Sequence, residues 1–219
     1  MNDSFVIYGK LVDIHARQII NACIHVENKK IQRIEKTDQE YDHYIMPGFV
    51  DAHVHIESSM MIPSSFARAA VKHGTVATVS DPHEIANVLG VEGVKFMISN
   101  SKKVPFKFYF GAPSCVPATP FETSGAVISA KDIRDLLESP DIYYLAEMMN
   151  FPGVIFNDTD VLAKLNHANE LKKPIDGHAP GLSGDNLKKY AGKNITTDHE
   201  CTTVEEAIEK INNGIKIQI

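Results

Sequence analysis

Two histidines that stand one residue apart, His53 and His55, lie in the stretch DAHVHIESS directly after the apolar run MPGFV. In a β-strand, residues two apart point to the same face, so both imidazoles can face one point while Val54 packs behind them. That geometry suits a shared metal ion. A pair of ordinary polar residues on a solvated strand face is the alternative interpretation, and an isolated HxH pattern does not decide between the two.

Three further residues of metal-ligand type follow later apolar runs. Glu147 ends the run in YYLAEMMN, where a carboxylate is costly to bury unless it is paired or bound to a cation. His178 in DGHAP and His199 in TTDHE repeat the pattern. Alone, each of these has an ordinary structural interpretation, but four imidazoles and one carboxylate form the nitrogen and oxygen set that Zn, Fe or Mn accepts. The set as a whole predicts a metal site.

A divalent ion at such a site lowers the pKa of its water toward about 7, which produces hydroxide at neutral pH. Hydroxide of this kind attacks an sp² carbon. Where two ions share a bridging carboxylate, one orients the hydroxide and the other polarises the substrate. The set therefore predicts hydrolysis of a C–N or C–O bond, with a nearby carboxylate or histidine moving the proton.

Four polar residues near the second predicted strand and after the HxH pair are candidates for that catalytic work. Their alternative role is to cap the helix that follows, because Asp, Ser and Glu are ordinary signals at helix N-termini. The candidate catalytic residues are Glu57, Asp81, His83 and Glu84.

The elements that position these residues follow from the pattern of apolar runs. Residues 1–45 alternate short apolar runs with polar turns, which predicts a small β-rich flank. In residues 46–219, short apolar strands alternate with segments of helical period, which predicts about seven strands, each followed by a helix except the last.

This alternation favours an α/β fold with a parallel sheet, either open or closed into a barrel. The candidate residues all fall at the carboxyl ends of successive strands, and in a (β/α) barrel those ends meet at one mouth. We therefore expect a metal-dependent hydrolase barrel. A closed barrel of this type has eight strands, so with seven counted here either one strand is missed or the barrel is incomplete at its C-terminal end. An incomplete barrel has an exposed edge, which favours homo-oligomers.

Composition narrows the partners. A formal net charge of −6 leaves no basic footprint for nucleic acid, and the apolar runs are too short to span a membrane. No secretory signal opens the chain, and the odd number of distant cysteines suits a reducing compartment, so we expect a cytoplasmic protein. Neither GxGxxG nor a P-loop pattern occurs, so no cofactor-binding residues are predicted beyond the metal ligands.

Several stretches together resemble a known family: MPGFVDAHVHIESSM, TVATVSDPHEIANVLG, FGAPSCVPATPFETSGA, LAEMMNFPGV, DGHAPGLSG and TTDHECT. They look like the N-terminal portion of the bacterial adenine deaminases, a branch of the amidohydrolase superfamily. The resemblance implies a metal-bearing (β/α)₈ barrel with a small β-sandwich flank. It also implies a role in purine salvage and adenine catabolism, by hydrolysis of adenine to hypoxanthine and ammonia.

Matched to the family, the first-strand ligands are His53 and His55, the bridging carboxylate is Glu147, and the later ligands are His178 and His199. Many superfamily members use a carboxylated lysine as the bridge, but IYYLAEMMN holds no lysine. The resemblance implies a binuclear centre of Mn or Fe, with Zn as an alternative. The family's last barrel strand carries an Asp that binds metal and moves protons, and no counterpart of that strand is present, so the resemblance implies a truncated chain.

Three functions remain open from the sequence. The first is a metal-dependent aminohydrolase that takes adenine, a cyclic amidine, as its small-molecule substrate. The second is another amidohydrolase, such as an amino-sugar deacetylase, which can also use a Glu bridge. The third is an inactive metal-binding fragment that lacks the last barrel strand.

Overall fold

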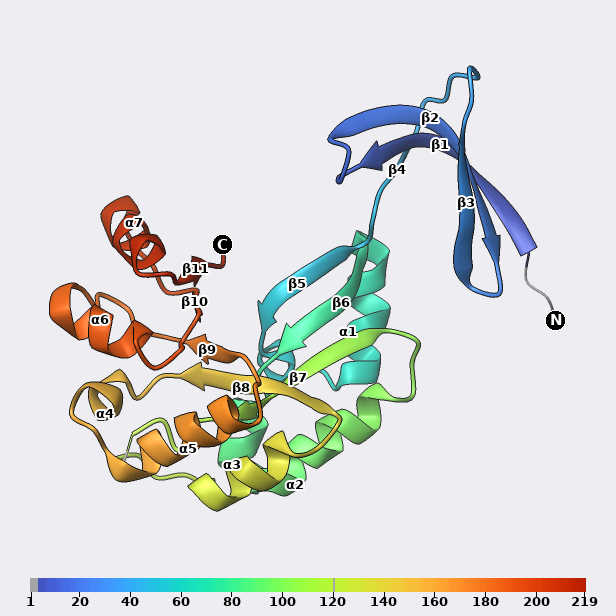
Figure 1. Cartoon of the computed structure of the whole chain (residues 1–219). Coiled ribbons are helices and arrows are strands. Elements are labelled where there is room, and N and C mark those ends of the chain that lie inside the picture. Colours follow the sequence, from blue (N-terminus) through green and yellow to red (C-terminus); the bar gives the residue numbers. More distant parts are fainter. Residues whose placement is uncertain (1–3, 120) are drawn as a thin grey trace. The chain divides into compact units, whose positions relative to one another are not determined.

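The computed structural model describes residues 4–119 and 121–219, and the chain divides into two compact units, Met1–Gly48 and Phe49–Ile219 (Figure 1). The first three residues of the expected flank lie outside the described part. The sequence places the division after residue 45, and the units of the structure divide after Gly48.

The first unit is a four-stranded sheet with the strand order β3-β2-β1-β4. β1 pairs with β2 and β2 with β3 in antiparallel fashion, whereas β4 runs parallel to β1. Asn28 and Lys29 both have positive φ, as a tight two-residue hairpin between β2 and β3 requires. The strands are β1 (Ser4–Asp13), β2 (Gln18–Glu27), β3 (Lys30–Lys36) and β4 (Tyr44–Ile45).

The second unit is built on parallel strands that follow one another in sequence order. Five of them form one sheet, β5-β6-β7-β8-β9, and β10 and β11 form a parallel pair. A single bridge from Ile175 to Ile195 joins the chain just before β10 to β9. The strands are β5 (Phe49–Val54), β6 (Thr75–Ser80), β7 (Lys107–Pro113), β8 (Ile142–Met148), β9 (Ile175–Gly177), β10 (Thr197–Asp198) and β11 (Lys216–Ile217).

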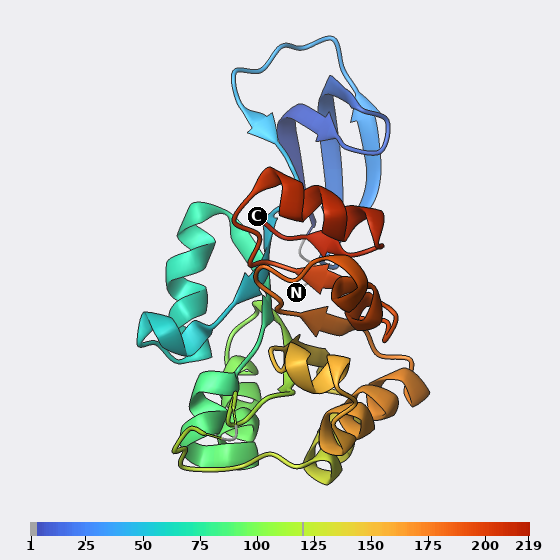
Figure 2. The same ribbon diagram turned by 90° about the vertical axis from the view of Figure 1, so that its left-hand side faces the viewer.

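Helices follow the strands and pack on the outer side of the curled sheet (Figures 1 and 2). Two short 3-10 turns, Ile56–Ser59 and Val71–His73, lie in the first connection. The helices are α1 (Pro63–Ala70), α2 (His83–Ser101), α3 (Ala130–Leu137), α4 (Phe151–Ile155), α5 (Thr159–Glu170), α6 (Gly184–Ala191) and α7 (Val204–Asn212).

Two local features differ from a plain reading of the helical pattern. α2 is broken at Gly90, whose φ of 60° and ψ of −145° are not helical. Only glycine adopts such angles readily, and a Cβ there would lie 3.1 Å from the Cβ of Ala126. α4 is a short extra helix that the sequence pattern does not predict. Asn150 caps its N-terminus, because the Asn150 side chain accepts a hydrogen bond from the backbone N–H of Gly153.

The expected fold class is confirmed: the second unit is an incomplete (β/α) barrel with seven strands. Its core lies between the sheet and the helices, where Phe110, Leu137, Leu145 and Leu165 are at most 2% exposed. None of the helices in the described residues combines the length and the apolar character that crossing a lipid bilayer demands.

α7 contains a fully buried lysine that ties the helix to β10 and to the chain after β9. Lys210 Nζ lies 3.0 Å from Asp198 Oδ2 and 2.8 Å from Glu206 Oε1, and it donates to the carbonyl of Ala179 at 2.8 Å. Lys210 and Asp198 both have 0% exposed side chains. Removing one partner of such a pair leaves an uncompensated buried charge, which is far more costly than losing a surface ion pair.

We therefore expect Lys210→Met to lower the free energy of unfolding by about 3–5 kcal/mol. The matched control is Lys188→Met on α6, because Lys188 pairs with Asp185 at the surface and the pair contributes less than about 1 kcal/mol. Urea unfolding followed by circular dichroism measures both. Equal losses in the two variants would contradict the expectation.

Candidate metal centre

Glu147, at the end of β8, is the point on which the four predicted histidine ligands converge. Its side chain is only 2% exposed. Oε1 lies 2.8 Å from Nε2 of His53 and 2.8 Å from Nε2 of His55. Oε2 lies 3.1 Å from Nδ1 of His178 and 3.7 Å from Nε2 of His199. Each carboxylate oxygen therefore faces a different pair of imidazoles.

The parallel strands bring these residues together from widely separated parts of the chain. His53 and His55 lie on and just after β5, while His178 and His199 directly follow β9 and β10. β9 and β10 are held close at Gly177, where a Cβ would meet the carbonyl oxygen of Thr197 at 2.4 Å. Only glycine allows this approach, which leaves the rings of His178 and His199 5.3 Å apart.

The donor atoms fit a divalent metal ion. Nε2 of His53 and Nε2 of His55 lie 3.1 Å apart, close to the separation of about 3.3 Å between two donors bound tetrahedrally at 2.0–2.1 Å. Glu147 Oε1 is buried and makes no hydrogen bond of good geometry, although two imidazole nitrogens approach it. A buried oxygen in that condition, ringed by nitrogen donors, is suited to a cation.

Electrostatics bind the cluster together when no ion is considered. Burial raises the pKa of Glu147, but contacts with His178, His53 and His55 outweigh burial and hold this pKa well below its usual range. Burial lowers the pKa of His53, but Asp176 and Glu147 raise it to about 10. For His55, burial is likewise outweighed, by Glu147 and the carbonyl of Asp81, and its pKa rises to about 9.

Asp81 and His83 form a pair beside the first-strand histidines. Asp81 is 1% exposed, and its Oδ2 lies 3.0 Å from Nδ1 of His83. The centroid of the His83 ring lies 4.5 Å from that of His55. Burial raises the pKa of Asp81. Asp81 does not cap α2. The capping position is occupied by Pro82, and the Asp81 carboxylate faces the His83 ring.

Glu57 makes a capping contact with the start of α2, the helix that follows β6. Its Oε1 accepts a hydrogen bond of 3.1 Å from the backbone N–H of Ile85, in the first turn of α2. Burial raises the pKa of the Glu57 carboxyl. Glu84 accepts a hydrogen bond from the hydroxyl of Ser58, so both glutamates tie the turn after β5 to the start of α2.

Sequence reasoning missed Asp176 on β9. One of its carboxylate oxygens lies within 4.8 Å of ring nitrogens of His53 and His199, and the Oδ2 atom is 3.3 Å from His53 Nδ1. The one available signal was a carboxylate two residues before His178 in PIDGHAP, which alternation places on the same face of a strand. His53 also stacks on His199, with ring centroids 3.8 Å apart.

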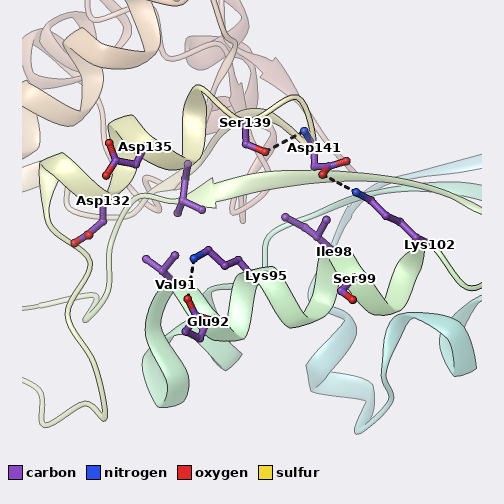
Figure 3. Close-up of a pocket in the computed structure, with 11 residues that line it drawn as sticks. Val91, Glu92, Lys95, Ile98, Ser99, Lys102, Asp132, Asp135, Ser139 and Asp141 are labelled. Carbon is purple, nitrogen blue, oxygen red and sulfur yellow. Dashed lines mark hydrogen bonds and ion pairs between the residues drawn. The ribbon is translucent and has the colours of Figure 1, made fainter.

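A separate cleft of about 650 Å³ lies between α2 and α3 (Figure 3). Lys95 pairs with Glu92 and Lys102 with Asp141, so both lysines that line the cleft are paired with carboxylates. None of the residues that line it is a histidine, and none belongs to the cluster around Glu147. The cleft is therefore not part of the candidate centre.

Comparison with known proteins agrees with this geometry. The sequence model of the amidohydrolase family matches residues 44–219. An adenine deaminase of Salinibacter ruber is 58% identical over 219 residues, which are 100% of this chain and 40% of that protein. An adenine deaminase of Sulfurovum sp. is 62% identical over 208 residues, 95% of this chain and 39% of that protein. The chain thus spans about 40% of the length of these curated relatives.

Solved structures share the fold at low identity. An atrazine chlorohydrolase from Arthrobacter aurescens has a TM-score of 0.64 at 11% identity, over 97% of this chain and 64% of that chain. The N-acetylglucosamine-6-phosphate deacetylase from Pasteurella multocida has a TM-score of 0.55 at 13% identity, over 89% of this chain and 56% of that chain. At these identities the likeness concerns the fold alone.

Binding of a divalent ion should depend steeply on pH. Imidazole binds metal in its neutral form, so His53 and His55, with pKa values of about 10 and 9 without an ion, must release their protons. Below pH 9, the apparent association constant should rise about tenfold per pH unit for each displaced proton. Competition with a chromophoric chelator between about pH 6 and 8 measures this rise.

His73→Gln is the control, because His73 is exposed and lies outside the cluster, and its pH dependence should equal that of the unchanged chain. An affinity that stays flat across this pH range would show that the two imidazoles are not the groups that take the ion.

Proposed function

The chain belongs to the amidohydrolase family, and from that premise we propose that it acts as a metal-dependent aminohydrolase that converts adenine to hypoxanthine and ammonia. Water is the second substrate: a C–O bond forms at C6 of the cyclic amidine, the C6–N bond breaks, and the amino group leaves as ammonia. The observation that carries the proposal is the buried Glu147 with two histidines at each oxygen. The adenine deaminases at 58% and 62% identity support the choice of substrate.

We assign the ligands as two sets that share Glu147. His53 and His55 would hold one ion together with Glu147, and His178 and His199 would hold a second with the same carboxylate, so the proposed centre is binuclear. When bound, the ions supply Lewis-acid chemistry that deprotonates water near neutral pH. Ligand type does not separate the first-row metals, so Mn or Fe is proposed on the family resemblance, with Zn as the alternative.

The remaining catalytic roles fall to residues around the cluster. Asp81 orients the His83 imidazole through the 3.0 Å contact, and His83 moves a proton between the attacking water and the departing amino group. Glu57 and Glu84 fix the turn after β5 and the start of α2, which border the space that the purine occupies in this proposal.

We also propose a cytoplasmic setting and a homo-oligomeric assembly. Cys23, Cys115 and Cys201 are free thiols, which suits a reducing compartment. Among the described strands, β11 pairs with β10 alone, and its other edge carries backbone groups that a partner element can pair with.

Glu147→Gln should lower the affinity for divalent ions by more than about 100-fold, because removing a group that only supports a ligand already costs about 10–100-fold. Adenine turnover should be lost with the ions. Elemental analysis of the purified protein and ammonia release from adenine measure the two effects. Glu170→Gln is the matched control, because Glu170 is 66% exposed on α5.

The same assay separates the competing functions, with the Sulfurovum adenine deaminase as the positive control. Acetate release from N-acetylglucosamine 6-phosphate would support a deacetylase instead. Bound metal without turnover of adenine would support an inactive metal-binding chain. Glu147→Gln with unchanged metal content would refute the bridging role.

His83→Asn should lower kcat for adenine by about 10²–10⁴-fold, because it removes a group that transfers a proton in the transition state. Metal content should stay at the level of the unchanged chain, since the proposed ligands are intact. His73→Asn on the surface is the control. Loss of metal together with activity would show that His83 is a ligand and not the proton carrier.

A further inference from the structure

Asp176 lies behind His53, on the side of the ring that faces away from Glu147. Its side chain is 6% exposed, and Oδ2 is 3.3 Å from His53 Nδ1, whereas Nε2 of the same ring faces Glu147. His53 Nδ1 and Asp176 Oδ2 are both buried, and among the described residues neither makes a hydrogen bond of good geometry, with the other or with a third group. A protonated His53 Nδ1 can donate a hydrogen bond and Asp176 Oδ2 can accept it, so each atom can satisfy the other.

The second carboxylate oxygen of Asp176 is held by its own strand and the next one. Oδ1 accepts hydrogen bonds from the backbone N–H of Gly177, at 2.9 Å, and from the hydroxyl of Thr197 on β10. The carboxylate is thereby fixed in one orientation between β9 and β10. It reaches across the barrel portion to β5, which is not a hydrogen-bonded neighbour of either strand.

The two first-strand histidines are oriented in the same sense but by different groups. His55 directs Nε2 at Glu147 and Nδ1 at the backbone carbonyl of Asp81, 2.9 Å away. His53 directs Nε2 at Glu147 and Nδ1 at the Asp176 carboxylate. Metal-binding imidazoles generally donate their other N–H to a carbonyl or carboxylate, which fixes the tautomer and strengthens the donor nitrogen.

We propose that Asp176 is a positioning residue that holds His53 as the Nδ1–H tautomer, with Nε2 directed at the ion. The inference rests on the proposed function, because it requires the ion that His53 binds. Asp176 acts through His53 and is not itself a ligand: Oδ1 is occupied by Gly177 and Thr197, and Oδ2 faces the ring nitrogen that points away from Glu147. Stacking of His53 on His199 fixes the plane of the ring, and Asp176 selects between the two ring orientations that a half-turn about the Cβ–Cγ bond exchanges.

The experiment compares Asp176→Asn and Asp176→Ala with the unchanged chain in competition titrations of Zn²⁺ and Mn²⁺ against a chromophoric chelator. Loss of the supporting carboxylate should lower the affinity for the ion that His53 binds by about 10–100-fold. Ala should weaken it more than Asn, since the Asn amide keeps an oxygen that accepts from Nδ1–H. The stoichiometry at saturating metal should stay unchanged.

One further pair of variants and one control separate positioning from general damage to the fold. Thr197→Val should lower the affinity for the ion, as Asp176→Asn does. Thr197→Ser keeps the hydroxyl and should have the affinity of the unchanged chain. Asp185→Asn is the matched control: Asp185 is an 89% exposed carboxylate on α6 that pairs with Lys188 at the surface and lies outside the cluster of histidines. Its affinity for Zn²⁺ should not change.

A spectroscopic readout tests the tautomer without turnover. In the zinc-loaded protein, ¹⁵N-edited NMR should show a slowly exchanging Nδ1–H proton of His53, which persists in Thr197→Ser and disappears in Asp176→Ala.

A folded Asp176→Ala variant with unchanged zinc affinity and an unchanged Nδ1–H signal would overturn the inference and leave the proposed function standing. Loss of one whole equivalent of zinc would overturn it too, because Asp176 would then be a ligand. An unchanged chain that binds no ion would refute the proposed function itself.

Discussion

The structure of the candidate centre depends on one buried charge, the carboxylate of Glu147. A carboxylate with 2% exposure at the end of an apolar strand is tolerable only when cationic or hydrogen-bonding groups surround it. Two imidazoles at each oxygen meet that requirement, and they come from three different strands. The requirement ties the register of the strands to the chemistry. A slip of β5 or β9 by one residue would turn the histidines that these strands position away from the carboxylate.

The second unit meets this requirement with very little regular structure at its later strands. β9 has three residues and β10 has two, yet each delivers a histidine to the same oxygen of Glu147. The close approach at Gly177 and the buried contacts of Lys210 with Asp198 and Glu206 hold these strands where few ladder hydrogen bonds do. Packing and ion pairing thus take over the role that long strands have in the first part of the sheet.

Much of this arrangement follows from the sequence, since the histidines and the glutamate at the carboxyl ends of several apolar strands indicate both a barrel and the convergence on Glu147. Asp176 and Glu57 show where such reasoning stops. A carboxylate's hydrogen-bonding partner depends on side-chain rotamers and on strands far away in the sequence, so nothing in PIDGHAP indicates that Asp176 reaches His53. The contact from Glu57 to Ile85 likewise spans 28 positions, and the break of α2 at Gly90 depends on the approach of Ala126.

The first-strand histidines differ in what orients them, and this difference has a consequence for how such a centre changes over generations. The acceptor for His55 Nδ1 is a main-chain oxygen, which every amino acid at position 81 would still provide. The acceptor for His53 Nδ1 is a side chain, which a single codon change replaces. A single substitution at position 176 can therefore change how His53 is oriented and how strongly the centre binds a cation. A substitution at position 81 leaves the acceptor for His55 in place.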